Sequence, residues 1–331
     1  MSTRLGVSFD GFITYDESID LARRAVAAGA SSLWMAEHLG YRDALVSSMG
    51  FLMATEEAIV VPTAVSPYMW HPTPTAMTLA TMAEAAPGRV AVAVGVGNPL
   101  FLGESGITPN KPLRVVKEYI ESLRALWSGE AVRRDGDMLY PLAGARMGFR
   151  PPKPIPIYIA AMREKMLAQA GRIADGVVLS AGLSVDFVAH SLEFCAAGAA
   201  EAGRDMSEID KAGYVFFSVA KERGAAYDAV REKIAFLMRN EALRDNIVRS
   251  GIAIEHEKII AAIAERDFET ASGLVPDEAA KAFAISGTPE DCAKGIRAFA
   301  EAGLDELVLL IVGTKQAQDL ALDVVRGVTG K

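Results

Sequence analysis

The chain has 331 residues, of which 51% are hydrophobic and 23% charged, and its formal net charge is −8. This composition is typical of a globular protein with a large core and excludes the intrinsically disordered class. The negative charge argues against a nucleic-acid partner, which normally requires a basic face.

Short β-rich runs alternate with amphipathic helical segments from the start of the chain. Residues 4–9 form a first strand, and the following segment has Thr14 and Glu17 at the spacing of a capping box. Gly29 suits the left-handed position that ends a helix, and residues 31–38 form the second strand. This order predicts a strand, a helix and a second strand.

The same order of helix, glycine and strand recurs in the middle of the chain and near its end. Residues 165–180 carry it in the middle. Near the end, Thr288 is placed to cap a helix, Pro289 occupies its first position and Gly303 closes it. Further strands are predicted within four apolar runs, which are 58–65, 89–97, 154–161 and 213–220.

These runs give eight strands, most of them continuously apolar, as in a parallel sheet that is covered on both faces. Eight strand–helix repeats predict an α/β fold of the (β/α)8 TIM-barrel type. A doubly wound fold would carry a glycine-rich turn after the first strand, where residues 8–12 read SFDGF. We expect one domain over residues 1–331.

Two segments are longer than barrel connections need to be. Residues 129–149 are predicted to form a small hairpin that turns at Asp135-Gly136. Residues 222–285 are predicted to be a mostly helical excursion before the last strand–helix unit. Additions of this size usually cover an active site or form an interface.

The chain carries no sign of a membrane or secreted protein. No apolar run approaches the roughly 18 residues that span a bilayer, and the first residues lack the pattern of a signal peptide. Cys195 and Cys292 are few and far apart, which suits a reducing compartment. We therefore expect a cytoplasmic location.

In a (β/α)8 barrel, functional residues gather where the strands end. Asp10 ends the first predicted strand, and Glu37 and His38 end the second, so we expect these three to lie close together. A carboxylate near an imidazole can do acid–base work or orient a substrate. A structural role for Asp10, or an arginine partner for Glu37, is the alternative.

Two further turns suit a phosphorylated ligand. Gly95 and Gly97 let the backbone approach a ligand, although glycines also serve tight corners. Arg163 and Lys165 stand at a predicted helix start, which basic residues normally avoid because of the helix dipole. They indicate an anionic partner, unless this turn is simply solvated and Glu164 supplies the favourable charge.

Several classes of site are excluded. The four histidines, at 38, 71, 190 and 256, form no H-E-x-x-H motif, and the cysteines lack zinc spacing. There is no G-x-S-x-G elbow and no phosphate-binding P-loop motif. We expect no metal site and no nucleophilic hydrolase.

The chain resembles the luciferase-like flavin and deazaflavin oxidoreductases, and within them the coenzyme F420-dependent 5,10-methylenetetrahydromethanopterin reductase branch. The resemblance covers nearly the whole chain except 222–285. It is most specific in the His-Pro corner at the end of VPTAVSPYMWHPTP (61–74), in the PGRVAVAVGVG run that follows, and in KMLAQAGRIADGV (165–177). It implies a barrel, usually dimeric or larger, that binds F420 or FMN at the strand ends.

In the deazaflavin branch, the third strand ends in a bulge with a non-proline cis peptide, against which the ring leans. The pair that matches it here is Ala64-Val65, followed by Ser66 and flanked by Pro62 and Pro67. The resemblance also implies phosphate contacts from the Gly97-Asn98 turn and from residues 162–165. Two departures are Arg163-Glu164, where relatives often have Gly-Pro, and Trp70, where they often have arginine.

These observations lead to three hypotheses. The first is an F420-dependent oxidoreductase that transfers a hydride to or from a small organic substrate, with Glu37, His38 and Asp10 at the reacting centre. The second is an FMN-dependent monooxygenase, in which His38 and His71 would steer activated oxygen. The third is a flavin-binding barrel without turnover. The predicted cofactor-binding residues are Ala64, Val65, Ser66, Gly97, Asn98, Ala161, Met162, Arg163, Lys165 and Ser180.

Overall fold

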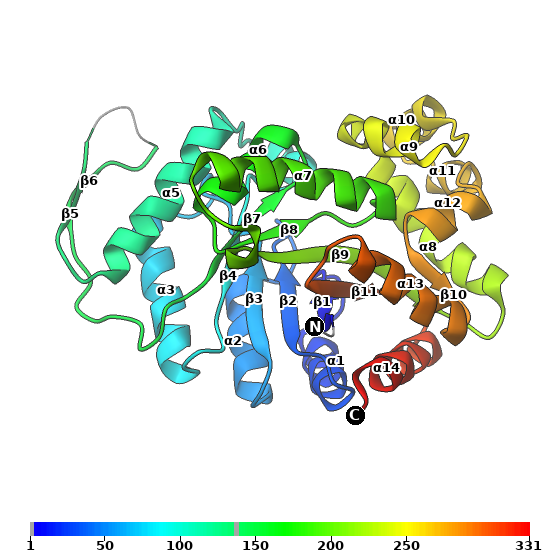
Figure 1. Cartoon of the computed structure of the whole chain (residues 1–331), viewed down its shortest axis with the longest axis horizontal. Coiled ribbons are helices and arrows are strands. Elements are labelled where there is room, and N and C mark those ends of the chain that lie inside the picture. The colour runs from blue at the N-terminus through cyan, green and yellow to red at the C-terminus, as the bar shows by residue number, and fades with distance from the viewer. Residues whose placement is uncertain (1–2, 136–138) are drawn as a thin grey trace.

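The computed structural model describes residues 3–135 and 139–331. Within them, eight parallel strands are ordered β3-β2-β1-β11-β9-β8-β7-β4 (Figure 1). Two parallel bridges, Val60 with Val90 and Val65 with Val94, join β3 to β4 and complete the circle. The predicted (β/α)8 barrel is confirmed. Its strands are β1 (Arg4–Phe9), β2 (Ser32–Ala36), β3 (Ile59–Thr63), β4 (Val92–Val94), β7 (Ile157–Ala161), β8 (Gly176–Leu179), β9 (Asp210–Val219) and β11 (Glu306–Ile311).

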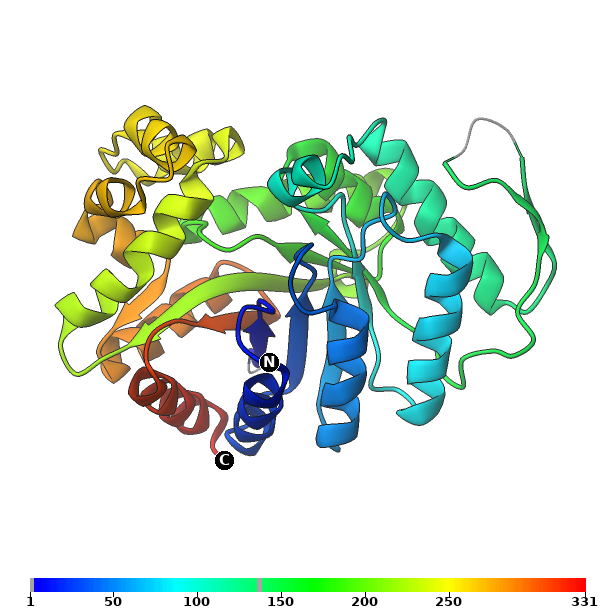
Figure 2. The same ribbon diagram turned by 180° about the vertical axis from the view of Figure 1, so that it is seen from behind.

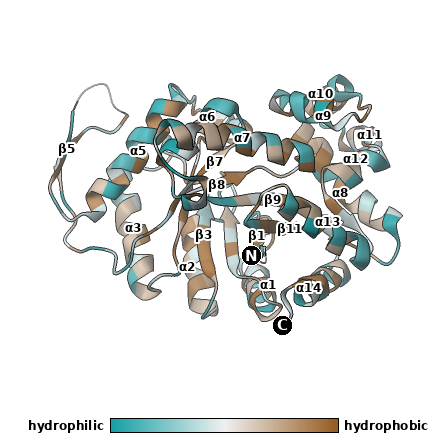
Figure 3. Ribbon diagram, viewed as in Figure 1, coloured by the Kyte–Doolittle hydropathy of each residue, from teal (hydrophilic) through white to brown (hydrophobic). Residues whose placement is uncertain are grey.

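Helices surround the barrel, as Figure 2 shows from behind. They bury their apolar faces against the strands, because a parallel sheet must be covered on its outer face. Figure 3 shows β3 mostly in the hydrophobic colour, whereas α13 carries hydrophilic residues outward. The surrounding helices are α1 (Tyr15–Ala27), α2 (Ala44–Ala54), α3 (Pro72–Ala85), α5 (Pro112–Trp127), α6 (Glu164–Ile173), α7 (Val185–Glu201), α8 (Arg223–Met238), α13 (Pro289–Glu301) and α14 (Lys315–Thr329).

Local sequence signals start and stop these helices as predicted. The Thr14 side chain accepts from Glu17 N, and the Glu17 carboxylate accepts from Thr14 N at 2.8 Å, which completes a capping box. Thr288 caps α13, with Pro289 at its first position. Gly29 and Gly303 have φ of +100° and +108°, the region that favours glycine after a helix.

The two additions lie at opposite ends of the molecule in Figures 1 and 2. Strands β5 (Val132–Arg134) and β6 (Leu142–Ala145) pair antiparallel, while Gly136 of the predicted turn lies outside the described residues. After α8 come α9 (Arg244–Ser250), α10 (His256–Ala264), α11 (Phe268–Gly273) and α12 (Asp277–Ala282). A short strand that the sequence did not reveal, β10 (Ile285–Gly287), pairs with β9.

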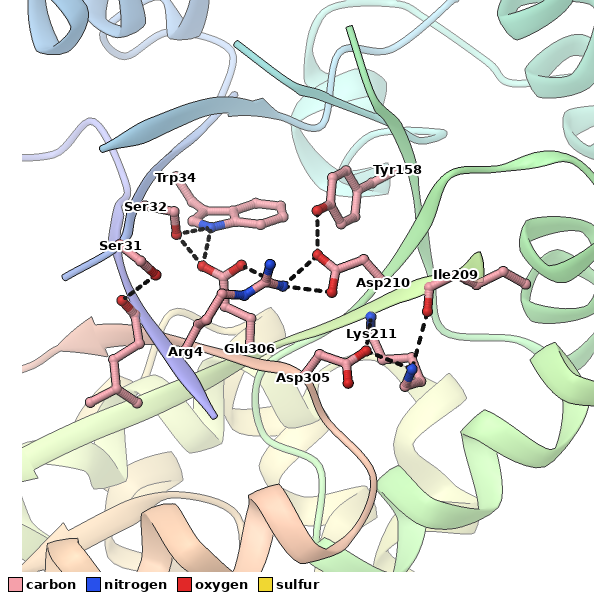
Figure 4. A network of polar contacts seen from close by, with 11 residues as sticks. Arg4, Ser31, Ser32, Trp34, Tyr158, Ile209, Asp210, Lys211, Asp305 and Glu306 are labelled. Carbon is pink, nitrogen blue, oxygen red and sulfur yellow. Dashed lines mark hydrogen bonds and ion pairs between the residues drawn. The ribbon is translucent and has the colours of Figure 1, made fainter. Parts of the chain in front are cut away.

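The N-terminal end of the barrel is closed by a polar network (Figure 4). Arg4 donates to both carboxylate oxygens of Asp210, at 2.5 and 2.6 Å, and lies 3.5 Å from Glu306 Oε2. Ser32 Oγ and Trp34 Nε1 both donate to Glu306 Oε1. Glu306 is only 4% exposed, and burial raises its pKa. These partners compensate a carboxyl that the barrel removes from water.

We predict that Glu306→Ala lowers the free energy of unfolding by about 2 to 4 kcal/mol, because it leaves a void and unpaired buried polar groups. Urea denaturation at unchanged slope measures this loss. The control is Glu301→Ala at an exposed position of α13, expected within about 0.5 kcal/mol of wild type. Equal stability of both variants would contradict the role of the network.

Candidate active site

The C-terminal end of the barrel interior is lined by small and hydroxyl side chains. Deeper in the barrel, a buried cluster contains Trp34, Val61, Ala93, Tyr158, Val178, Ala212 and Val308. Because side chains alternate along a strand, the residues two positions further on face the same interior. We call this set, together with Ser8 of β1, the upper layer; its other members are Ala36, Thr63, Gly95, Ala160, Ser180, Tyr214 and Leu310.

Three small residues of neighbouring strands meet in or beside the upper layer. A Cβ placed on Gly95 would lie 3.0 Å from Ala64 Cβ and 3.1 Å from Ala160 Cβ. A larger side chain at Gly95 would displace these neighbours. Glycine therefore keeps this part of the surface free of protruding side chains. We call the area formed by Ala64, Gly95 and Ala160 the low surface, because no large side chain projects from it. Such a surface at the strand ends of a barrel is suited to the face of a flat ring.

The cis peptide lies one residue earlier than predicted, at Thr63-Ala64 instead of Ala64-Val65. Val65 continues the pairing with β4 instead: its N–H donates to Ala93 O at 2.8 Å, and its carbonyl accepts from Gly95 N at 3.3 Å. Ala64 and not Val65 therefore faces the interior, and Val65 is fully buried behind it.

Ser66 is fully buried and holds the third and fourth strand ends together. Its hydroxyl donates to Val96 O at 2.7 Å and accepts from Tyr68 N at 3.2 Å. Both bonds fix the shape of the bulge. The structure therefore gives Ser66 a backbone-positioning role beside the predicted ring site.

Asp10 and His38 come together as expected. His38 Nδ1 lies 2.8 Å from the backbone oxygen of Asp10. A carbonyl oxygen only accepts, so Nδ1 carries the proton and Nε2 is left as an acceptor. The Asp10 carboxylate accepts from Phe12 N at 3.1 Å and lies 3.7 Å from Lys233 Nζ of α8.

Aromatic rings enclose His38. Phe12 stacks on its imidazole with centroids 5.2 Å apart, and Phe101 of α4 (Pro99–Glu104) lies at 5.2 Å on a tilted plane. Tyr41 packs on Phe12 at 4.5 Å. Burial lowers the pKa of His38, and the charges of Lys233 and Arg239 act in the same direction, whereas the hydrogen bond to Asp10 and its charge oppose them. His38 is therefore a neutral imidazole that forms part of a wall of aromatic rings.

Glu37 does not join this pair. Its carboxylate turns to the start of α2 and accepts from Ala44 N at 3.0 Å. Burial raises the pKa of Glu37 to about 7, which the Ala44 hydrogen bond opposes and the Asp43 charge supports. Position at a strand end therefore did not predict the direction of the side chain, because the free N–H groups of α2 attract the carboxylate.

The two segments predicted to contact phosphate have suitable backbones. Gly97 has φ of +97°, and Asn98 Oδ1 accepts from Leu100 N at 3.0 Å. Arg163 is the N-cap of α6 but its side chain makes no capping bond. Arg163 and Lys165 are exposed and form no ion pair within the described part of the chain. Their charges face solvent.

Two buried hydroxyls of the upper layer form no hydrogen bond of standard geometry within residues 3–135 and 139–331, although they lie close to each other and to Thr63. They are Ser8 Oγ and Tyr214 OH. Burial raises the pKa of Tyr214, which the nearby Thr63 and Ser8 hydroxyls oppose. The alternation in GYVFFSV places Tyr214 inward, so this residue could have been found from the sequence. Buried polar groups without partners are expected where a ligand or water supplies them.

The remaining predicted residues are Ala161, Met162 and Ser180. Ala161 is buried, and Met162 and Ser180 are half-buried at the ends of β7 and β8. No group of three or more His, Cys, Asp or Glu side chains suited to a metal ion occurs in the described ranges. Nor does any helix there have the length and apolarity to cross a membrane.

The chain is a (β/α)8-barrel oxidoreductase, because its site lies at the strand ends of the barrel and its relatives are oxidoreductases. The chain belongs to the luciferase-like monooxygenase family, whose model matches residues 2–306. It is 33% identical to the 5,10-methylenetetrahydromethanopterin reductase of Methanolobus tindarius, over 90% of this chain and 91% of that one. The family prediction is confirmed.

Two further relatives extend the comparison. The F420-dependent glucose-6-phosphate dehydrogenase of Nakamurella multipartita is 27% identical over 92% of this chain and 89% of its own. The structure of the coenzyme F420-dependent tetrahydromethanopterin reductase from Methanopyrus kandleri superposes with a TM-score of 0.87, at 24% identity and 98% coverage of both chains. This last likeness establishes the fold.

We predict that Glu37→Gln removes part of the pH dependence of stability. A pKa raised from 4.5 to about 7 in the folded state stabilises the wild type fully below about pH 4.5. As the pH rises through about 7, the free energy of unfolding loses this contribution, which amounts to roughly 3 kcal/mol. The difference in unfolding free energy between wild type and variant, measured from pH 4 to 8, should follow this curve. A constant difference would contradict the raised pKa.

Proposed function

We propose that the protein is a coenzyme F420-dependent oxidoreductase that transfers a hydride to or from a small organic substrate, as in 5,10-methylenetetrahydromethanopterin reductase. The observation that carries the proposal is the low surface formed by Ala64, Gly95 and Ala160 at the C-terminal end of the barrel. The Methanolobus and Nakamurella relatives support the same chemistry.

The residues at this end of the barrel fit a flat, phosphorylated cofactor. The ring would lie on Ala64, Gly95 and Ala160, and the hydroxyls of Ser8 and Tyr214 would donate to its polar edge. Of the predicted set, we assign cofactor contacts to Ala64, Gly97, Asn98, Ala161, Met162, Arg163, Lys165 and Ser180. Val65 and Ser66 are fully buried and support the backbone beside the ring. When bound, the deazaflavin supplies a hydride to an electrophilic carbon, or accepts one in the reverse direction.

The protein side of the reaction is orientation and proton management. His38 presents a neutral Nε2 beside the aromatic wall, where it can accept or return a substrate proton. Asp10 fixes the imidazole through its backbone oxygen and offsets the charge of Lys233. Glu37, whose pKa is about 7, would hold a proton at the start of α2, apart from the pair formed by Asp10 and His38. Phe12, Tyr41 and Phe101 would exclude water from the reacting carbon.

Binding and oxygen uptake test this proposal together. We expect the purified chain to bind F420 more tightly than FMN and to consume no oxygen with substrate and reduced coenzyme. Fluorescence titration measures the binding, and an oxygen electrode measures the uptake. Tight FMN binding with substrate-dependent oxygen consumption would replace the proposal by a monooxygenase. Binding without turnover of any carbonyl, alcohol or iminium substrate would favour a binding protein.

We also propose that the protein is a homo-oligomer and that helix α2 contributes to the interface. The sequence of α2, ALVSSMGFLMA, carries no charge, and a helix that is apolar all round is normally covered. Val46 and Met53 are nevertheless 66% and 70% exposed, and Met77 of the adjacent α3 is 50% exposed. A second copy placed on this face would remove them from water.

The free, fully buried cysteines Cys195 and Cys292 support a cytoplasmic location.

We predict that the double variant Val46→Glu, Met53→Glu is monomeric while the wild type is a dimer or larger. Charges on both positions would have to be desolvated in the interface. Light scattering coupled to gel filtration measures the mass. Val328→Glu, at an exposed apolar position on α14, is the matched control and should leave the mass unchanged. A monomeric wild type would contradict the interface.

A further inference from the structure

The end of helix α8 lies between the two segments predicted to contact phosphate. Arg239 Nη2 is 3.4 Å from Asn98 Oδ1, in the turn after β4. Asn240 Nδ2 is 3.9 Å from Met162 Sδ, just after β7. No motif in residues 222–285 predicted that they would lie at this place. A cation of the helical excursion thus lies beside the first segment, and the next residue lies beside the second.

Arg239 differs from the other arginines of this excursion because it is half-buried and has no carboxylate partner in the described parts of the chain. Three of its other arginines each pair with a carboxylate, namely Arg223 with Asp291, Arg231 with Asp277 and Arg244 with Glu257. Arg239 is half-buried, yet no carboxylate lies within ion-pair distance of it in the described parts of the chain. Burial lowers its pKa, with no anion opposing the effect. A desolvated guanidinium without a counter-ion indicates an anionic ligand.

The known contacts of Arg239 leave donors for such a ligand. Its guanidinium stacks on the Phe236 ring at 3.7 Å, and Nη1 donates to the Phe236 carbonyl, one of the last in α8. With the Asn98 contact, these use two of five N–H groups. The stacking fixes the plane of the guanidinium, which favours bidentate binding of a phosphate.

Neighbouring contacts hold the end of α8 in place. His256 Nε2 lies 2.5 Å from Met238 O, the residue before Arg239. Asn246 of α9 is fully buried, donates to Gly182 O at 2.9 Å and accepts from Ser184 N at 2.9 Å. These bonds tie the excursion to the loop after β8. Arg239 is therefore presented from a fixed support.

We propose that Arg239, oriented by Asn98 and Phe236, binds the phosphate group of the cofactor tail. This inference rests on the proposed cofactor but assigns a residue outside the predicted set. It gives the excursion a function, which is to close the phosphate end of the site with a cation. The exposed Arg163 and Lys165 would then contribute long-range attraction, and Arg239 the directed hydrogen bonds.

The test combines a side-chain change with a ligand change. Dissociation constants are measured by fluorescence titration and calorimetry for F420 and for its deazaflavin–ribityl core, which lacks the phosphate. For Arg239→Gln we expect a Kd for F420 raised about ten- to hundredfold, and a Kd for the core within about twofold of wild type. Arg239→Lys, which keeps the charge but not the fork, should recover part of the affinity.

A matched control separates this effect from net charge and folding. Arg249→Gln removes an exposed arginine from α9 and should leave both constants unchanged. The thermal midpoints of the variants without ligand should agree with wild type. If the excursion needs Arg239 to fold, the midpoint falls and the core loses affinity as well.

Three results for Arg239→Gln would overturn the inference. The first is an equal loss of affinity for F420 and for the core, and the second is no loss of affinity for either. The third is a raised substrate KM with an unchanged Kd for F420, which would place the anion on the substrate. If wild type binds FMN instead, the pair FMN and riboflavin replaces F420 and its core, and the same difference is expected. A wild type that binds no member of either pair contradicts the proposed function itself.

Discussion

Closure of eight parallel strands into one barrel determines the chemistry available to this protein. Closure fixes which side chain on each strand faces inward, so the interior becomes a stack of layers. The deeper buried cluster, which contains Trp34 and Tyr158, is filled with side chains and lies next to the Arg4–Asp210–Glu306 network. The upper layer holds alanine, glycine, serine and threonine, with Tyr214 and Leu310 as its two large members. Small and hydroxyl side chains therefore gather at one end of the barrel, and the charged network lies at the other.

The two ends also treat charge differently. At the N-terminal end, the buried carboxyl of Glu306 is surrounded by donors, so removing it from water is compensated. At the C-terminal end, the hydroxyls of Ser8 and Tyr214 form no hydrogen bond of standard geometry within the described residues, and Arg239 has no carboxylate. Polar groups left incompletely paired at the strand ends of a barrel are expected where a ligand supplies the missing partners.

Much of the fold followed from the sequence, because apolar runs, caps and glycines act locally. Thr14, Gly29, Thr288 and Gly303 sit where those signals placed them. Features that depend on non-local contacts could not be predicted in this way. The cis bond lies one residue earlier than predicted, where Val65 pairs with β4. The Glu37 carboxylate turns to the free N–H groups of α2. The contacts of Lys233 and Arg239 depend on where α8 ends in space, which no pattern in residues 222–285 reveals.

The proposed function requires a deazaflavin ring to rest on the strand ends of β3, β4 and β7. A crystal structure of the complex with F420 would show whether it does. We expect the ring with one face against Ala64, Gly95 and Ala160, its polar edge within hydrogen-bond distance of Tyr214 or Ser8, and His38 on the side open to substrate. A coenzyme bound away from these three small residues, or with its ring outside the C-terminal end of the barrel, would contradict it.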